Sequence, residues 1–113
     1  MATIKSYTDL FQSKTLSKIL PIESADMCYL KREINDTFIE TPIVKPKGDV
    51  LKSLPCWSLA ALFGVLPNYQ LQTQDDGIGI LCSCNGNFNI ITADNPVDAC
   101  YEMILKLNEL KML

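Results

Sequence analysis

The fold class is decided by residues 69–92, which read YQLQTQDDGIGILCSCNGNFNIIT. Asp76-Gly77 and Asn85-Gly86 are strong hairpin signals, because a type I′ turn needs positive φ at both of its central residues. Strand-forming side chains alternate with polar ones on both sides of these turns. We therefore predict a three-stranded antiparallel meander with strands over 69–74, 78–84 and 87–92.

Two-residue turns fix the register of the meander and so assign every side chain to one of its faces. The predicted core face carries Tyr69, Leu71, Ile80, Cys82 and Ile91. The opposite face carries Gln70, Gln72, Gln74, Leu81, Ser83, Phe88 and Ile90. This second face is half apolar, so we expect the segment 35–52, a helix or a partner to cover it.

Residues 54–67, LPCWSLAALFGVLP, carry Ser58 as their only polar side chain. A surface helix could not expose such a run, and it is shorter than the roughly 20 residues that span a membrane. Prolines stand near both of its ends, where they limit a helix. We therefore predict a buried core helix over 54–67, with Ser53 as its N-cap and Pro55 in its first turn.

The predicted core helix has two different faces. One is bulky and consists of Leu59, Leu62, Phe63 and Leu66, whereas the other is flatter and consists of Trp57, Ala60, Ala61, Gly64 and Val65. The bulky face is expected to fill the space over the sheet, and the flat face to meet the C-terminal helix or a second copy. Trp57 is either a core residue or the wall of a ligand pocket.

Three further elements are predicted from periodicity and capping. A short helix over 13–20 follows a possible N-terminal arm at 1–12, and a strand covers 27–34. The last helix begins at Asp94 or Asn95, with Pro96 in its first turn. Its polar side carries Asp98, Glu102, Lys106 and Glu109, and its apolar face carries Val97, Cys100, Tyr101, Met103, Ile104, Leu105, Leu107 and Leu110.

The segment 35–52 is predicted as a long loop, because it carries Pro42, Pro46 and Gly48 among scattered charges. Its apolar pairs at 38–39 and 43–44 favour a hidden edge strand within it. The order of elements predicts a single α+β domain over 1–113. Its architecture is a two-layer sandwich, in which an antiparallel three- to four-stranded meander packs against two or three helices.

Composition narrows the classes of function. The chain has 113 residues, of which 48% are hydrophobic and 20% charged, as is ordinary for a globular domain. Ten basic residues stand against thirteen acidic ones, and no dense Lys/Arg cluster occurs, so we expect no nucleic acid partner. No secretory signal or membrane span is visible, so we expect a cytoplasmic protein without membrane contact.

The chain contains no histidine, which is the commonest general base. Its five cysteines lie in largely apolar contexts and are predicted to be reduced core thiols. Cys82 and Cys84 would share a strand face and could sense oxidation or bind zinc together with Cys28, Cys56 or Cys100, although the spacing is unusual for zinc.

The acidic side chains Asp75, Asp76 and Asp94 could gather at one end of the meander. However, they are also what a hairpin turn and a helix cap use. We therefore predict no catalytic, cofactor-binding or metal-binding residue and no cofactor, and an enzyme is the less favoured interpretation.

Three segments carry a resemblance to a known family: 12–27 (QSKTLSKILPIESADM), 54–67, and 95–113, which begins NPVDACYEMILKL. They resemble short uncharacterised proteins encoded by gut anaerobic bacteria, often within their prophages and mobile elements. No activity is assigned to that group, so the resemblance implies only context. A small accessory protein of a mobile element is more often a binder or regulator than a metabolic enzyme.

The leading hypothesis is a protein-interaction module that contacts a protein partner or a second copy of itself. Its predicted contact residues are Leu81, Phe88, Ile90 and Trp57, together with the segment 35–52. The alternative is a small ligand-binding protein or enzyme with a pocket between the core helix and the sheet. A third possibility is a structural component of a virion.

Overall fold

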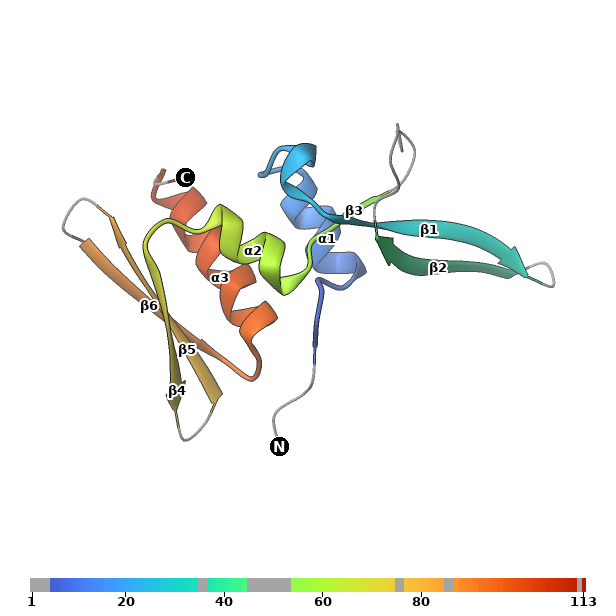
Figure 1. Ribbon diagram of the computed structural model, residues 1–113. Helices are drawn as coiled ribbons and strands as arrows, with labels where there is room; N and C mark the ends of the chain where they lie inside the picture. Colours follow the sequence, from blue (N-terminus) through green and yellow to red (C-terminus); the bar gives the residue numbers. More distant parts are fainter. Residues whose placement is uncertain (1–4, 35–36, 45–53, 75–76, 85–86, 112) are drawn as a thin grey trace.

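The computed structural model describes residues 5–34, 37–44, 54–74, 77–84, 87–111 and 113. Within them the chain forms two antiparallel sheets of three strands each, with three α-helices between the sheets (Figure 1). This arrangement confirms the predicted α+β class. The elements are α1 (Leu10–Ser17), the 3-10 helix η1 (Ile22–Ser24), β1 (Met27–Ile34), β2 (Thr37–Val44), β3 (Leu54–Cys56), α2 (Leu59–Val65), β4 (Tyr69–Gln74), β5 (Gly77–Cys84), β6 (Asn87–Ala93) and α3 (Pro96–Glu109).

The predicted meander is confirmed as the sheet of order β4-β5-β6. The predicted assignment of residues to its two faces is confirmed, since Ile80 pairs with both Leu71 and Ile91 and Leu81 pairs with Ile90. Gly77, which was predicted in the first turn, is instead the first residue of β5 and pairs with Gln74. Ile80 and Cys82 are fully buried, but Tyr69 and Leu71 each keep 41% of their surface exposed. They are exposed because α3 contacts the central strand β5 and the edge strand β6, leaving the other edge open. Residues 75–76 of the first predicted turn and both residues of the second, 85–86, lie outside the described residues.

Helix α3 begins where the sequence predicts. Asn95 is its N-cap and accepts a hydrogen bond from the backbone N–H of Asp98 at 2.9 Å, with Pro96 as the first helical residue. Its apolar face is buried at Val97, Cys100, Tyr101, Met103, Ile104 and Leu107. Leu110, which was predicted on that face, is 49% exposed because it lies at the C-terminal cap, at the end of the helix.

The predicted core helix over 54–67 is wrong in its first part. Residues 54–56 are the short strand β3, in which Pro55 pairs with Cys28 of β1. Proline is tolerated there because β3 is an edge strand of the sheet ordered β2-β1-β3. Helix α2 starts after Ser58, whose hydroxyl oxygen accepts from the backbone N–H of Ala61 at 3.2 Å. The predicted cap, Ser53, lies outside the described residues.

The faces of α2 follow the prediction only on the bulky side. Leu62 and Leu66 are buried in the core, as expected. Ala60 and Gly64 are exposed, and a Cβ atom built on Gly64 would have open space around it. At these positions the flat face therefore meets no described helix of the same chain, although α2 and α3 are in contact elsewhere.

Residues 5–12 are not a separate arm. Helix α1 already starts at Leu10, capped by Asp9, and Gln12 completes a capping box by accepting from the backbone N–H of Asp9. Upstream, the N–H of Thr8 donates to the carbonyl of Trp57 at 2.9 Å, and the N–H of Leu59 donates to Ser6 at 3.0 Å. Phe11 points to solvent and is 74% exposed, so α1 does not bury its apolar residues on two opposite sides.

The strand β1 and the hidden strand within the predicted loop are both confirmed. Residues 37–44 form β2, which pairs along the whole of β1. The remaining parts of the predicted loop, 35–36 and 45–52, lie outside the described residues. The strand β1 does not extend the meander as a fourth strand, because it belongs to the second sheet.

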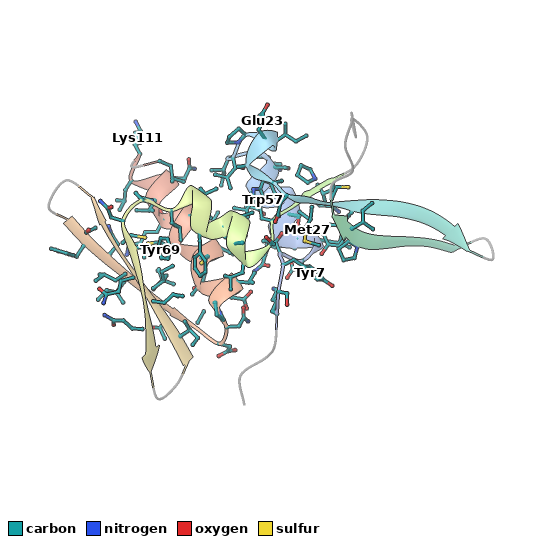
Figure 2. The ribbon with its side chains drawn as sticks, in the orientation of Figure 1. Tyr7, Glu23, Met27, Trp57, Tyr69 and Lys111 are labelled. Atoms are coloured by element: carbon teal, nitrogen blue, oxygen red, sulfur yellow. The ribbon has the colours of Figure 1, made fainter. Side chains whose placement is uncertain are left out.

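A buried polar cluster around Thr8 joins the N-terminal segment to this second sheet. The hydroxyl of Thr8 accepts from the backbone N–H of Trp57 at 3.1 Å and lies 2.8 Å from the hydroxyl of Ser13. The Tyr29 hydroxyl of β1 donates to the carbonyl of Thr8 at 2.7 Å. Trp57 lies at the centre of the molecule and donates from its indole nitrogen to the hydroxyl of Ser24 at 2.9 Å (Figure 2). These bonds satisfy polar groups that would be costly to bury alone.

Two glycines give opposite expectations for stability. Gly77 has φ +150°, and a Cβ atom there would lie 2.3 Å from the carbonyl oxygen of Ala93. We expect Gly77→Ala to lower the free energy of unfolding by about 1–3 kcal/mol. Gly64→Ala, in an exposed helical position, should raise it by about 0.5 kcal/mol. Urea denaturation monitored by the fluorescence of the single tryptophan measures both. Equal changes in the free energy of unfolding for the two variants would contradict the conclusion that Gly77 is strained and crowded whereas Gly64 is not.

Candidate interaction surface

The outer face of the sheet β4-β5-β6 carries three apolar side chains that the chain leaves open to solvent. Phe88 is 70% exposed and Ile90 is 56% exposed, while Leu81 is half-buried. Leu81 pairs directly with Ile90, and Phe88 is two residues from Ile90 on the same strand. We call Leu81, Phe88 and Ile90 the outer patch. The structure thus brings these three predicted contact residues together on one face.

Among the described residues, those that surround the outer patch on this face are uncharged. The described residues on this face are Gln70, Gln72, Gly79, Leu81, Ser83, Phe88, Ile90 and Thr92. The cores of protein interfaces are likewise depleted of charged residues, because burying a charge without a partner is costly. The outer face therefore has the composition of an interface centre with a hydrogen-bonding border.

Trp57, the fourth predicted contact residue, does not belong to this surface. Its side chain is fully buried in the core cluster that also contains Leu62 and Ile80. A partner or ligand cannot reach it without opening the core. The prediction that Trp57 contacts a partner or walls an open pocket is therefore wrong, and the interpretation as a core residue is confirmed.

The segment 35–52 does not share a surface with the outer patch over its described part. Strand β2 is paired to β1 in the second sheet, and this hairpin projects from the side of the molecule opposite β4-β5-β6 (Figure 1). The predicted combined contact surface is wrong for residues 37–44. The physical reason is that β2 pairs with β1 along its whole length, which fixes it in the other sheet.

The described part of the chain gives no support to the oxidation-sensing or zinc-binding role that the sequence left open for the cysteines. Cys82 is fully buried on the inner face, and burial raises the pKa of its thiol. Burial also raises the pKa of Cys100 to about 12, so in both cases the environment disfavours the thiolate that reacts or binds metal. Among the described residues, no three His, Cys, Asp or Glu side chains lie close enough to hold a metal ion. The side chain of Cys84, and Asp75 with Asp76, are not among the described atoms.

A polar network around Asp98 was not predicted. Its carboxylate accepts from Lys5 Nζ and from Gln12 Nε2, both at 2.8 Å, and from Asn95 Nδ2 at 2.9 Å. Lys5 also donates to Asp9 at 3.2 Å. Helical periodicity places Asp98 on the polar side of α3, and nothing in the sequence pairs it with a lysine 93 residues away. The network ties the N-terminal segment to the start of α3.

The environment of Asp98 favours its charged form. Partial burial alone would raise the pKa of this carboxyl, but hydrogen bonds from Lys5, Gln12 and Asn95 outweigh it and hold the pKa below its ordinary value. Burial alone would lower the pKa of Lys5, and its bonds to Asp98 and Asp9 instead raise it. Both groups are therefore charged in the folded protein near neutral pH.

Replacing Asp98 tests this network. Asp98→Asn keeps the shape of the side chain but replaces one acceptor oxygen with an NH2 donor, which would face the donor groups of Lys5, Gln12 and Asn95. We therefore expect the free energy of unfolding at pH 7 to fall by about 2 kcal/mol. Because the folded pKa is depressed, the stabilisation is complete above the unfolded pKa and is lost as pH falls through the folded one. Urea denaturation from pH 7 to pH 3 should show the difference between wild type and variant shrinking below about pH 4. Glu109→Gln, at an exposed position, is the control, and a similar loss there would contradict the role of Asp98.

Comparison of the chain with protein-family models, with curated proteins and with solved structures finds no match. None of the helices in the described residues is both long enough and apolar enough to cross a membrane.

Proposed function

We propose that the chain is a small protein-interaction module whose contact surface is the outer face of the sheet β4-β5-β6. The observation that carries this proposal is the exposure of Phe88 and Ile90, at 70% and 56%, two residues apart on one face. A single exposed apolar residue is ordinary, but contiguous apolar side chains on an open sheet face are characteristic of a binding surface.

The partner that this face fits is a second copy of the chain. The protein carries a net charge of −3, yet every described residue of the outer face is neutral. Two such faces can therefore meet without bringing like charges together, whereas a strongly charged partner would find no complement there. Sheets pack face to face about 10 Å apart, with their side chains interdigitating, so Phe88 and Ile90 would be buried between the two copies.

The size of the face sets the expected strength of association. Three strands at about 4.8 Å spacing and seven residues at about 3.3 Å each give a face of roughly 14 by 23 Å. Two copies would bury on the order of 650 Å² of projected area, below the ~1,200 Å² at which stable complexes begin. The proposal is thus a reversible dimer that forms with increasing concentration, not an obligate one.

The place of the module in the cell is also part of the proposal. The resemblance to short proteins of prophages and mobile elements supports a cytoplasmic accessory role without catalysis.

The alternative, a ligand pocket between α2 and the sheet, has less support because Trp57 and Leu62 fill that space as fully buried core residues.

Light scattering coupled to size exclusion, over loading concentrations from about 10 µM to 1 mM, tests the proposal. We expect the weight-average mass of the wild type to rise from 12.6 kDa toward twice that value. The double variant Phe88→Asp with Ile90→Asp should stay at the monomer mass, because each dimer would bury four carboxylates without partners. Circular dichroism confirms that the variant is folded.

Phe11→Asp is the matched control, since Phe11 is equally exposed, at 74%, but lies on α1 and not on the sheet. It should associate as the wild type does. A wild type that remains monomeric across the whole range, or a control that loses association as fully as the double variant, would refute the proposal.

A further inference from the structure

Within the described residues, the helices cover little of the edge strand β4. Its side chains are exposed on both faces of the sheet, at Tyr69, Gln70, Leu71 and Gln72. Helix α2 reaches the strand through Phe63, whose ring stacks on that of Tyr69 with the ring centroids 4.7 Å apart. Tyr69 and Leu71 nevertheless each keep 41% of their surface exposed. The side of β4 that faces away from β5 is therefore accessible.

The hydrogen bonds of β4 to β5 show which of its backbone groups face outward. The N–H of Ser83 donates to the carbonyl of Asn68 at 3.2 Å, just before the strand begins. Because bonded pairs recur at every second residue of an antiparallel ladder, the even-numbered residues of β4 bond to β5. The odd-numbered ones, Tyr69, Leu71 and Thr73, direct their N–H and C=O groups away from it. Within the described residues, no hydrogen bond from these outward groups to another element is found.

This edge lacks the residues that usually prevent strand pairing. Exposed sheet edges are commonly protected by proline or by charged side chains. The edge strand β2 contains Glu40 and Pro42, and the edge strand β3 contains Pro55. Strand β4, with the sequence YQLQTQ, contains neither proline nor charge. Its outward backbone is therefore open to pairing with another strand.

We propose that β4 pairs with β4 of a second copy, antiparallel and centred on Leu71, which joins the two sheets into one of six strands. A two-fold axis at Leu71 places Leu71 opposite itself and Tyr69 opposite Thr73 of the second copy. All three outward residues then lie in hydrogen-bonded pairs, each of which exchanges two backbone hydrogen bonds. A two-fold axis at residue 70 or 72 would leave one of the three without a partner in the other strand.

The side chains of β4 match those of a second copy in this register. Leu71 would meet Leu71 on the inner face, and Gln70 would lie opposite Gln72 on the outer face, where the two amides can bond to each other. The chain has a net charge of −3, but its β4 strand is neutral, so two copies can approach along it without placing like charges opposite each other. A charged partner strand would find no complement on this edge.

Edge pairing goes beyond the proposed function because it uses a different surface. The two-fold axis is perpendicular to the joined sheet, so both outer patches lie on the same side of it. The shared outer face would measure roughly 29 by 23 Å, about twice that of one copy. The backbone bonds at the edge replace bonds to water, so the contact is weak on its own. It therefore adds little to the mass in solution until the outer face is also engaged.

A cysteine at the two-fold position would trap this contact as a disulfide. Opposite residues of a hydrogen-bonded pair have Cα atoms about 5.5 Å apart, a distance that a disulfide can span. In a glutathione redox buffer, Leu71→Cys should form at least about ten-fold more linked dimer than Tyr69→Cys. Tyr69 is the matched control because it is equally exposed on the same face, but its two copies would lie about 13 Å apart along the strands. Non-reducing electrophoresis of the full chain measures the linkage, and the wild type corrects for the native cysteines.

A second pair of variants tests the register. Residues 70 and 72 of the two copies would form a non-hydrogen-bonded pair, with Cα atoms about 4.5 Å apart. A mixture of Gln70→Cys and Gln72→Cys should therefore give more linked dimer than either variant alone. Both variants also carry Phe88→Asp and Ile90→Asp, which removes linkage through the proposed outer-face dimer.

The same background separates the two contacts for Leu71→Cys. Leu71 lies on the inner face, so Phe88→Asp with Ile90→Asp should leave its linkage unchanged even where the outer-face dimer is lost. Circular dichroism confirms that each variant is folded. Equal linkage of Leu71→Cys and Tyr69→Cys, loss of the Leu71→Cys linkage in this background, or a mixture that links no better than its single variants would overturn the proposal.

Discussion

A three-stranded sheet has two faces, and the described part of this chain provides one long helix to cover them. Helix α3, with 14 residues, is about 21 Å long and so matches the length of strands β5 and β6. It buries Ile80 and Cys82 on one face. Phe88 and Ile90 on the other face remain in solvent, at a hydrophobic cost that burial against a partner would remove. Within the described residues, only one face of this sheet is covered by a helix. The candidate contact surface is the face that stays uncovered.

The remaining elements cannot cover the outer face because they are held elsewhere. Helix α2 lies beside α3, and α1 lies against β3. The buried hydroxyl of Thr8 joins the N-terminal segment to Trp57, and the carboxylate of Asp98 joins Lys5 and Gln12 to α3. Trp57 is enclosed between these connections and contributes its indole N–H to η1. The side chains that hold the two sheets together thus also keep the described residues of the first half of the chain away from the outer patch.

Much of the second half of the chain could be predicted from the sequence, because its signals are local. The alternation of apolar and polar residues predicted the two faces of β4-β5-β6, and Asn95 with Pro96 marked the start of α3. The errors lie where tertiary pairing outweighs a local pattern. Residues 54–56 look helical by apolarity but pair with β1 as an edge strand. The hidden strand within 35–52 was expected, but its pairing with β1 in a second sheet was not. The Asp98 network joins residues 93 apart, and no pattern within a single segment reports such a contact.

The face on which molecules meet can be located directly by amide NMR spectra recorded over a dilution series. The account predicts that concentration-dependent shifts cluster on the outer face of β4-β5-β6, at Leu81, Phe88 and Ile90 and at Gln70 and Gln72 beside them. The amides of Phe11 and of the other sheet should keep constant positions. Shifts confined to the β1–β2 hairpin, or a spectrum that does not change with concentration, would contradict the claim that this chain associates through the open face of its sheet.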